Sequence, residues 1–96
     1  MRKKPTAQVS RELLDSLFEE FDLWNKIRDG RLTSFPLPRK DVPSRLWPGA
    51  LSRIVKHNLP SGKHLATTHR VEAPDGTILH EDAKDFHLQE VCLWRL

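Results

Sequence analysis

Apolar residues recur at helical spacing in the first third of the chain. The stripe covers an arc of about 140° on a helical wheel and consists of Leu13, Leu14, Leu17, Phe18, Phe21 and Trp24. Ser10 suits an N-cap and Gly30 suits the position after the last turn, so we expect one long amphipathic helix between them. Leu23 lies opposite this stripe and Ile27 flanks it, which leaves apolar surface for the folded chain or a partner protein to cover.

The middle of the chain combines a proline-rich segment with a short apolar one. Four of the seven prolines fall in residues 32–49, where we expect irregular or extended structure because each proline fixes φ and removes a backbone donor. Leu51, Ile54 and Val55 then stand at helical spacing behind a proline. This spacing predicts a short helix from about Pro48 to His57.

The last third has the pattern of strands. Pro74-Asp75-Gly76 indicates a hairpin turn, because proline pre-sets the turn, aspartate caps it and glycine accepts a positive φ. Closing this turn on Ala73 and Thr77 predicts four facing pairs, which are Val71 with Leu79, Arg70 with His80, His69 with Glu81, and Thr68 with Asp82. A third strand is predicted over about Phe86 to Leu96 by its apolar run.

Together these elements predict an α+β domain. One long N-terminal amphipathic helix and one short helix pack on a small antiparallel sheet of about three strands. Because 96 residues suit one core, we assign a basic flexible tail to residues 1–9 and a single α+β domain to residues 10–96. Cys92 falls in an apolar run, where a buried and inert thiol is expected. Without an export signal or a long apolar run, we expect a cytoplasmic protein that makes no membrane contact.

Charge is segregated along the sequence. Residues 39–70 hold seven lysines and arginines against one aspartate, whereas residues 10–30 and 71–96 carry net charges of −3 and −4. The basic residues are Arg39, Lys40, Arg45, Arg53, Lys56, Lys63 and Arg70. We expect them to form a surface that binds the RNA or DNA backbone, with Trp47 available for stacking on bases.

Two other functions compete with nucleic-acid binding. A protein-binding regulator or inhibitor, such as a mobile-element or toxin/antitoxin-type protein, would use Leu23, Ile27 and Trp47. A metal-independent ribonuclease would take its acid, base and phosphate-binding groups from the hairpin, at His64, Thr68, Arg70 and His80. Because polar side chains are the default on an exposed sheet face, we expect a binding protein rather than an enzyme.

The sequence lacks motifs that would identify other sites. It contains no phosphate-binding loop, dinucleotide-binding fingerprint or nucleophile elbow, and no small-molecule ligand is indicated. His64, His80 and Asp82 are potential metal ligands, but no motif of fixed spacing supports them, so we expect neither a metal nor a cofactor. We do not expect the string His80-Glu81-Asp82 to close a site alone, because consecutive strand residues point to opposite faces.

Overall fold

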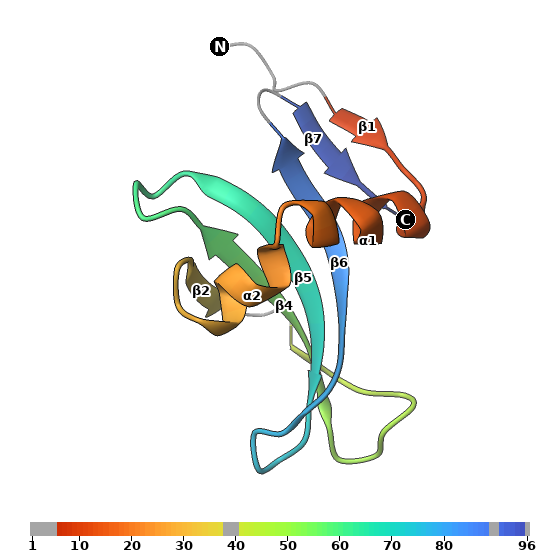
Figure 1. Cartoon of the computed structure of the whole chain (residues 1–96). Coiled ribbons are helices and arrows are strands. Elements are labelled where there is room, and N and C mark those ends of the chain that lie inside the picture. The colour runs from red at the N-terminus through yellow and green to blue at the C-terminus, as the bar shows by residue number, and fades with distance from the viewer. Residues whose placement is uncertain (1–5, 38–40, 89–90, 96) are drawn as a thin grey trace.

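The computed structural model describes residues 6–37, 41–88 and 91–95 (Figure 1). Two short helices, α1 (Arg11–Glu20) and α2 (Leu23–Arg28), lie over one face of a mixed sheet. Its strands are β1 (Thr6–Gln8), β2 (Thr33–Pro36), β3 (Val42–Pro43), β4 (Leu51–Asn58), β5 (His64–Glu72), β6 (Ile78–Leu88) and β7 (Val91–Trp94). The order across the sheet is β1-β7-β6-β5-β4-β2, and β3 also pairs with β4. Among the described strands, β1 and β7 form the one parallel pair, and all other pairs are antiparallel.

The predicted α+β fold with a small sheet is wrong. Strands account for 48% of the chain and helices for 19%, and the sheet has seven strands rather than three. Most of the segment predicted as a helix from Pro48 to His57 belongs to β4, which pairs with β5 on one side and with β2 and β3 on the other. A short apolar run fits either element by periodicity, and here pairing on both edges decides in favour of the strand.

The two chain ends also differ from expectation. Thr6–Gln8, part of the predicted flexible tail, forms β1 beside β7, while residues 1–5 lie outside the described residues. The third strand predicted over Phe86 to Leu96 is divided between the end of β6 and β7, which pair antiparallel. In the described part of the chain, no helix has the length and apolar character needed to cross a bilayer.

The predicted long N-terminal helix is broken in two. Ser10 caps α1 as expected, with its Oγ accepting the Leu13 N–H at 3.1 Å. Asp22 then adopts a left-handed φ of 55°, which ends the first helix axis and starts another. This break turns Leu23 inward, where it is only 1% exposed. Leu23 therefore belongs to the core and is not available to a partner, whereas Ile27 stays half-buried.

The core lies between the helices and strands β5 and β6. Its buried residues are Leu14, Phe18, Leu23, Ala66, Ala83 and Phe86. The ring of Phe18 lies 5.1 Å from that of Trp24 and 6.1 Å from that of Phe86, measured between centroids. The alanines are fully buried, and their small side chains let the helices lie close to the sheet. One face of the central strands is therefore covered by helices, and polar side chains accumulate on the other.

The hairpin between β5 and β6 closes at the predicted turn but with a different register. Ala73 N–H donates to the Thr77 carbonyl at 2.8 Å, and Gly76 has a φ of 90°. Two bulges shift the pairing along β6, the first opposite Val71 and Glu72 near the turn and the second opposite Thr67 and Thr68. The observed pairs are Val71 with His80, Arg70 with Glu81, His69 with Asp82, and Thr68 with Ala83, so the four predicted pairs are wrong by one residue. A bulge inserts one extra residue into a strand, and its position cannot be predicted from the alternation of apolar and polar residues in the sequence.

The second bulge determines which face of the sheet carries the side chains of Asp82 and Asp85. Ala83 and Phe86 both pack in the core although they are three residues apart on one strand. This spacing is possible because Lys84 is the extra residue between the Thr68–Ala83 and Thr67–Asp85 pairs. Asp82 and Asp85, the neighbours of Ala83 and Phe86, consequently both lie on the sheet face opposite to these two core residues.

The Gly76→Ala variant is expected to lose about 1 to 2 kcal/mol of unfolding free energy, because an alanine is strained at positive φ. A Cβ at this position would meet nothing within 4 Å, so the cost arises in the backbone alone. Urea unfolding measures the change, with Thr77→Ser as a control in the same turn. Equal midpoints for Gly76→Ala and the parent chain would contradict this account of the turn.

Candidate functional site

A pocket of about 690 Å³ lies beside β4, β5 and β6, and Arg11 at the start of α1 reaches its edge. The segment from Val42 to Trp47 forms its apolar wall. Its polar lining consists of Ser52, His69, His80 and Asp82, together with the arginines Arg11, Arg45 and Arg95. The sequence did not predict this pocket, because its lining residues come from six separate segments of the chain.

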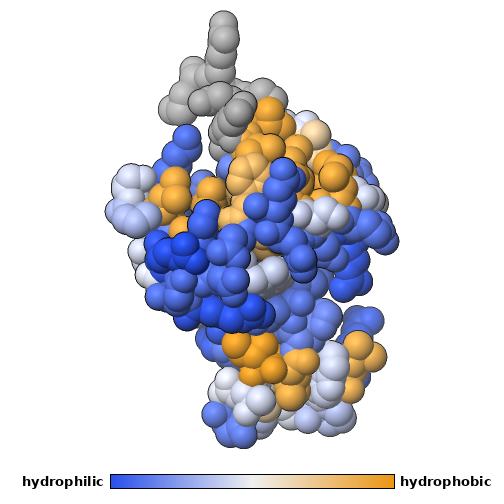
Figure 2. Space-filling view, viewed as in Figure 1, coloured by the Kyte–Doolittle hydropathy of each residue, from blue (hydrophilic) through white to orange (hydrophobic). Residues whose placement is uncertain are grey.

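The pocket adjoins exposed apolar surface at the lower end of the molecule. Figure 2 shows hydrophobic side chains gathered there, where Figure 1 places the loop before β4 and the β5–β6 hairpin. Leu46 is 80% exposed and Val42 is 53% exposed, and both line the pocket. A ligand entering the pocket would therefore cover apolar as well as charged groups.

Three polar side chains form a hydrogen-bonded relay across adjacent strands. His69 on β5 faces Asp82 on β6, and its Nδ1 lies 2.9 Å from Oδ1 of the carboxylate. Nε2 of the same ring contacts Oγ of Ser52 on β4. With an ionised aspartate, Nδ1 donates to the carboxylate and Nε2 accepts from the hydroxyl. This order of hydroxyl, imidazole and carboxylate is the one in which an imidazole acts as a general base.

Asp82 is the centre of this group. Its side chain is 8% exposed, and Nε2 of His80 lies 3.5 Å from the same Oδ1 that accepts from His69. The guanidinium of Arg95 pairs with Oδ2 and also donates from Nε to the Ala83 carbonyl at 2.6 Å. A buried carboxylate requires such partners because its desolvation is costly. Asp82 therefore fixes two imidazoles and one guanidinium at one wall of the pocket.

The charge state of His69 suits a base. Burial lowers the pKa of His69 below its ordinary value of 6.5, and the positive charges of Lys84 and Arg95 lower it further. The ring is therefore neutral near pH 7, with the lone pair of Nε2 directed toward Ser52. A neutral imidazole held in this tautomer can accept a proton from a hydroxyl group.

A second imidazole and further cations face the same pocket. The ring centroids of His69 and His80 are 6.2 Å apart, and the indole of Trp47 stacks on His80 at 6.1 Å with an interplanar angle of 21°. Arg11 and Arg45 also line the pocket, and neither forms an ion pair with a carboxylate of the described residues. The pocket thus presents two imidazoles, positive charge and an aromatic surface to a ligand.

The structure separates the residues predicted for a basic surface. Arg53 pairs with Glu72 at 2.7 Å and with Asp41 at 3.2 Å, and Arg70 pairs with Glu72 at 3.1 Å. Arg45 lines the pocket, Lys56 is half-buried on β4 and Lys63 is exposed in a turn, while Arg39 and Lys40 lie outside the described residues. Part of the positive charge expected from the sequence is therefore balanced by local carboxylates.

The predicted ribonuclease residues do not share one face. Thr68 is fully buried and hydrogen-bonds to His57, and Arg70 pairs with Glu72. Of the four residues His64, Thr68, Arg70 and His80, only His80 lines the pocket. The sequence pattern did not predict Ser52 and His69 as site residues, and it predicted Asp82 as the partner of Thr68 across the hairpin and as a potential metal ligand. One sequence feature does point to this site: His80 and Asp82 are two residues apart, which places both side chains on one face of a strand.

A separate buried histidine has a structural role. His57 is fully buried, with Nδ1 2.6 Å from Oγ of Ser34 and Nε2 2.8 Å from Oγ1 of Thr68. Burial lowers its pKa to about 4, and the nearby Arg70 acts in the same direction. The ring is therefore neutral and joins strands β2, β4 and β5 through hydroxyl groups.

This burial predicts a loss of stability in mild acid. As the pH is lowered from 6.5 to about 4, His57 of the unfolded chain takes up a proton that the folded ring does not. The unfolding free energy therefore decreases as the pH decreases through this range. The contribution is at most about 3 kcal/mol. Urea unfolding across this range should show a shallower pH dependence for His57→Gln, which keeps hydrogen-bonding groups. An equal slope in both proteins would contradict the assignment.

Comparison with known protein families, curated proteins and solved structures found no match to this chain. The function is therefore inferred from the geometry and chemistry of the site.

Proposed function

We propose that the chain is a metal-independent ribonuclease that binds RNA in the 690 Å³ pocket. The observation that supports this proposal is the pair of imidazoles, His69 and His80, beside one buried carboxylate in a pocket that also contains arginines. Cleavage of RNA through its 2′-hydroxyl requires a base, an acid and positive charge near the phosphate. The sequence predicts an RNA or DNA partner on a broad basic surface, whereas this proposal takes RNA as the partner and the pocket as its binding site.

In this mechanism His69 is the base. Its Nε2 takes the proton of a ribose 2′-hydroxyl, and the freed oxygen attacks the adjacent phosphorus. Oδ1 of Asp82 accepts a hydrogen bond from Nδ1–H of His69, with 2.9 Å between Nδ1 and Oδ1, and the carboxylate stabilises the positive ring that results. The Ser52 hydroxyl contacts Nε2 in this structure, and the ribose hydroxyl replaces it there when the substrate binds.

His80 is the acid because it is the second imidazole of the pocket. It gives a proton to the 5′-oxygen as the bond between phosphorus and that oxygen breaks, which leaves a 2′,3′-cyclic phosphate and a free 5′-hydroxyl. Arg45 and Arg11 are the candidates for binding the phosphate, because Arg95 already pairs with Asp82. Trp47 supplies a surface on which a base can stack.

Cleavage of a labelled RNA in EDTA tests the proposal. His69→Gln and His80→Gln are each expected to lower the rate by about 100-fold or more, the usual contribution of a general acid or base. The product should carry a cyclic phosphate, and RNA methylated at the 2′-oxygen should resist cleavage. The acidic limb of the pH–rate profile should lie below pH 6.5, because the pKa of His69 is lowered.

His57→Gln serves as the matched control, because His57 lies in the core and does not line the pocket. Absence of cleavage by the folded parent protein would contradict the proposal. Rates that stay undiminished in both the His69 and His80 variants would also contradict it, since contaminating nuclease would then explain the activity.

The salt dependence of RNA binding tests the role of Arg45. Loss of one phosphate contact should weaken binding and reduce the slope of log affinity against log salt by about 1. Lys63→Ala is the control, because Lys63 is exposed in the turn before β5 and away from the pocket lining. If the slope of log affinity against log salt changes in Lys63→Ala and not in Arg45→Ala, the phosphate binds away from Arg45, which would contradict this role.

A second function is favoured by one contact. Ser52 Oγ touches Nε2 of His69, and the relay continues to Asp82, as in enzymes that use serine as a nucleophile. Ser52→Ala separates the two functions, because it should leave RNA cleavage within a few-fold of the parent rate but abolish ester hydrolysis through a seryl intermediate. Covalent labelling of Ser52 by an organophosphorus reagent, together with failure to cleave RNA, would favour the serine hydrolase.

A further inference from the structure

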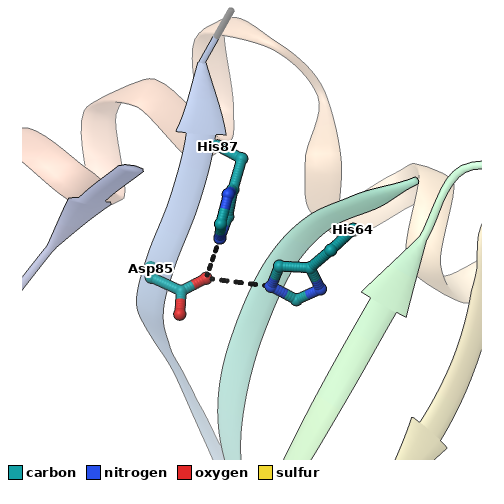
Figure 3. A group of neighbouring side chains, drawn as sticks. All are labelled: His64, Asp85 and His87. Carbon is teal, nitrogen blue, oxygen red and sulfur yellow. Dashed lines mark ion pairs between the residues drawn. The ribbon is translucent and has the colours of Figure 1, made fainter. Parts of the chain in front are cut away.

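A second cluster of two histidines and one aspartate lies outside the pocket. His64 stands at the start of β5, and Asp85 and His87 alternate along β6 (Figure 3). The figure shows both imidazoles directed at the carboxylate of Asp85. None of these side chains lines the 690 Å³ pocket.

Strand irregularities bring the three side chains together. The register between β4 and β5 shifts at His57 and Asn58, so His64 rather than Leu65 pairs with Asn58. Leu65 is the extra residue of this irregularity, so His64 lies on the sheet face opposite to Ala66. The bulge at Lys84 puts Asp85 on that side as well. Neither position follows from simple alternation along the strands.

The separations suit ligands around one metal ion. Nε2 of His64 and Nε2 of His87 lie 3.5 and 3.8 Å from Oδ1 of Asp85. All three ligand atoms lie within 4.8 Å of one another. Ligands of tetrahedral zinc, each about 2.0 to 2.1 Å from the ion, are roughly 3.4 Å apart. The observed distances exceed those of good hydrogen bonds and approach this spacing.

The hydrogen bonds around His64 leave Nε2 as an acceptor. Its Nδ1 lies 3.2 Å from Oδ1 of Asn58, a pairing in which the ring nitrogen donates. The hydroxyl of Thr67 lies 3.1 Å from Nε2 and can donate to it. In this tautomer Nε2 and Oδ1 of Asp85 are two acceptors 3.5 Å apart, and Oδ1 is buried with no hydrogen bond of good geometry from the described residues. A cation between them would satisfy both atoms.

We propose that His64, Asp85 and His87 bind one divalent transition-metal ion, with zinc the best match. Two imidazoles and one carboxylate suit zinc and its neighbours rather than calcium or magnesium, which prefer oxygen ligands. Three protein ligands leave a fourth position for water or another ligand. Asn58 acts as an outer partner that fixes the tautomer and orientation of His64.

The His69–His80–Asp82 group is the weaker metal candidate, although its ligand atoms also lie within 4.8 Å of one another. Nδ1 of His69 already donates to Asp82 at 2.9 Å, and Nε2 contacts Ser52. Neither ring nitrogen is therefore left as a metal ligand without breaking the relay. The two clusters thus have different chemistry despite the same composition, and the metal proposal is independent of the ribonuclease proposal.

Zinc binding to the metal-stripped full chain tests the site. Calorimetric titration should show one ion per chain, and zinc should raise the thermal unfolding midpoint because the ion joins β5 to β6. His87→Ala and the isosteric Asp85→Asn should each weaken binding by about 100-fold or more. Asn58→Ala should weaken it by about 10- to 100-fold, as expected for an outer partner.

His80→Ala is the matched control and should retain the ion, because it removes a histidine of the other cluster only. Loss of zinc binding in His80→Ala with retention in Asp85→Asn and His87→Ala would place the ion in the pocket and overturn the proposal. A folded parent chain that binds neither Zn²⁺ nor Co²⁺ would also overturn it. RNA cleavage in EDTA is measured separately, so failure of one proposal is distinguishable from failure of the other.

Discussion

The burial of the Asp82 carboxylate is the constraint on which the site depends. A carboxylate that is 8% exposed must be compensated by charge and hydrogen bonds, and its partners come from β5, β6 and the chain after β7. The side chains that satisfy Asp82 are therefore held in one arrangement. His69 is fixed in a neutral, accepting tautomer, and Arg95 ties the end of the chain to the sheet. The same interaction thus contributes to both the fold and the proposed chemistry.

The position of Asp82 results from two departures from regular strand geometry. Without the bulge near the hairpin turn, His69 would face Glu81, and the imidazole would lie on the face opposite to Asp82. Without the bulge at Lys84, Ala83 and Phe86 could not both pack beneath the helices. Bulges of this kind commonly redirect side chains beside functional sites. Here they place two His–Asp clusters on one face of the sheet and the core residues Ala83 and Phe86 on the other.

Much of the local structure was predictable, and most of the long-range structure was not. The Ser10 cap and the Pro74-Asp75-Gly76 turn follow from short-range chemistry and were confirmed. The break at Asp22 and the strand at Leu51–Asn58 depend on tertiary packing and pairing, which the sequence pattern did not reveal. The prediction of the site failed for the same reason, since the register between β4 and β5 is what brings Ser52 and His69 into contact. His80 and Asp82 were recognisable from their alternate spacing.

The most direct test of this account is the tautomeric state of His69, measured by long-range ¹H–¹⁵N correlation spectra of the imidazoles near neutral pH. The relay predicts a neutral ring protonated at Nδ1, with that proton shifted downfield by its hydrogen bond to Asp82 and lost from this position in Asp82→Asn. A ring protonated at Nε2, or one that exchanges freely between tautomers, would show that Asp82 does not hold His69. The proposed site would then lose its base.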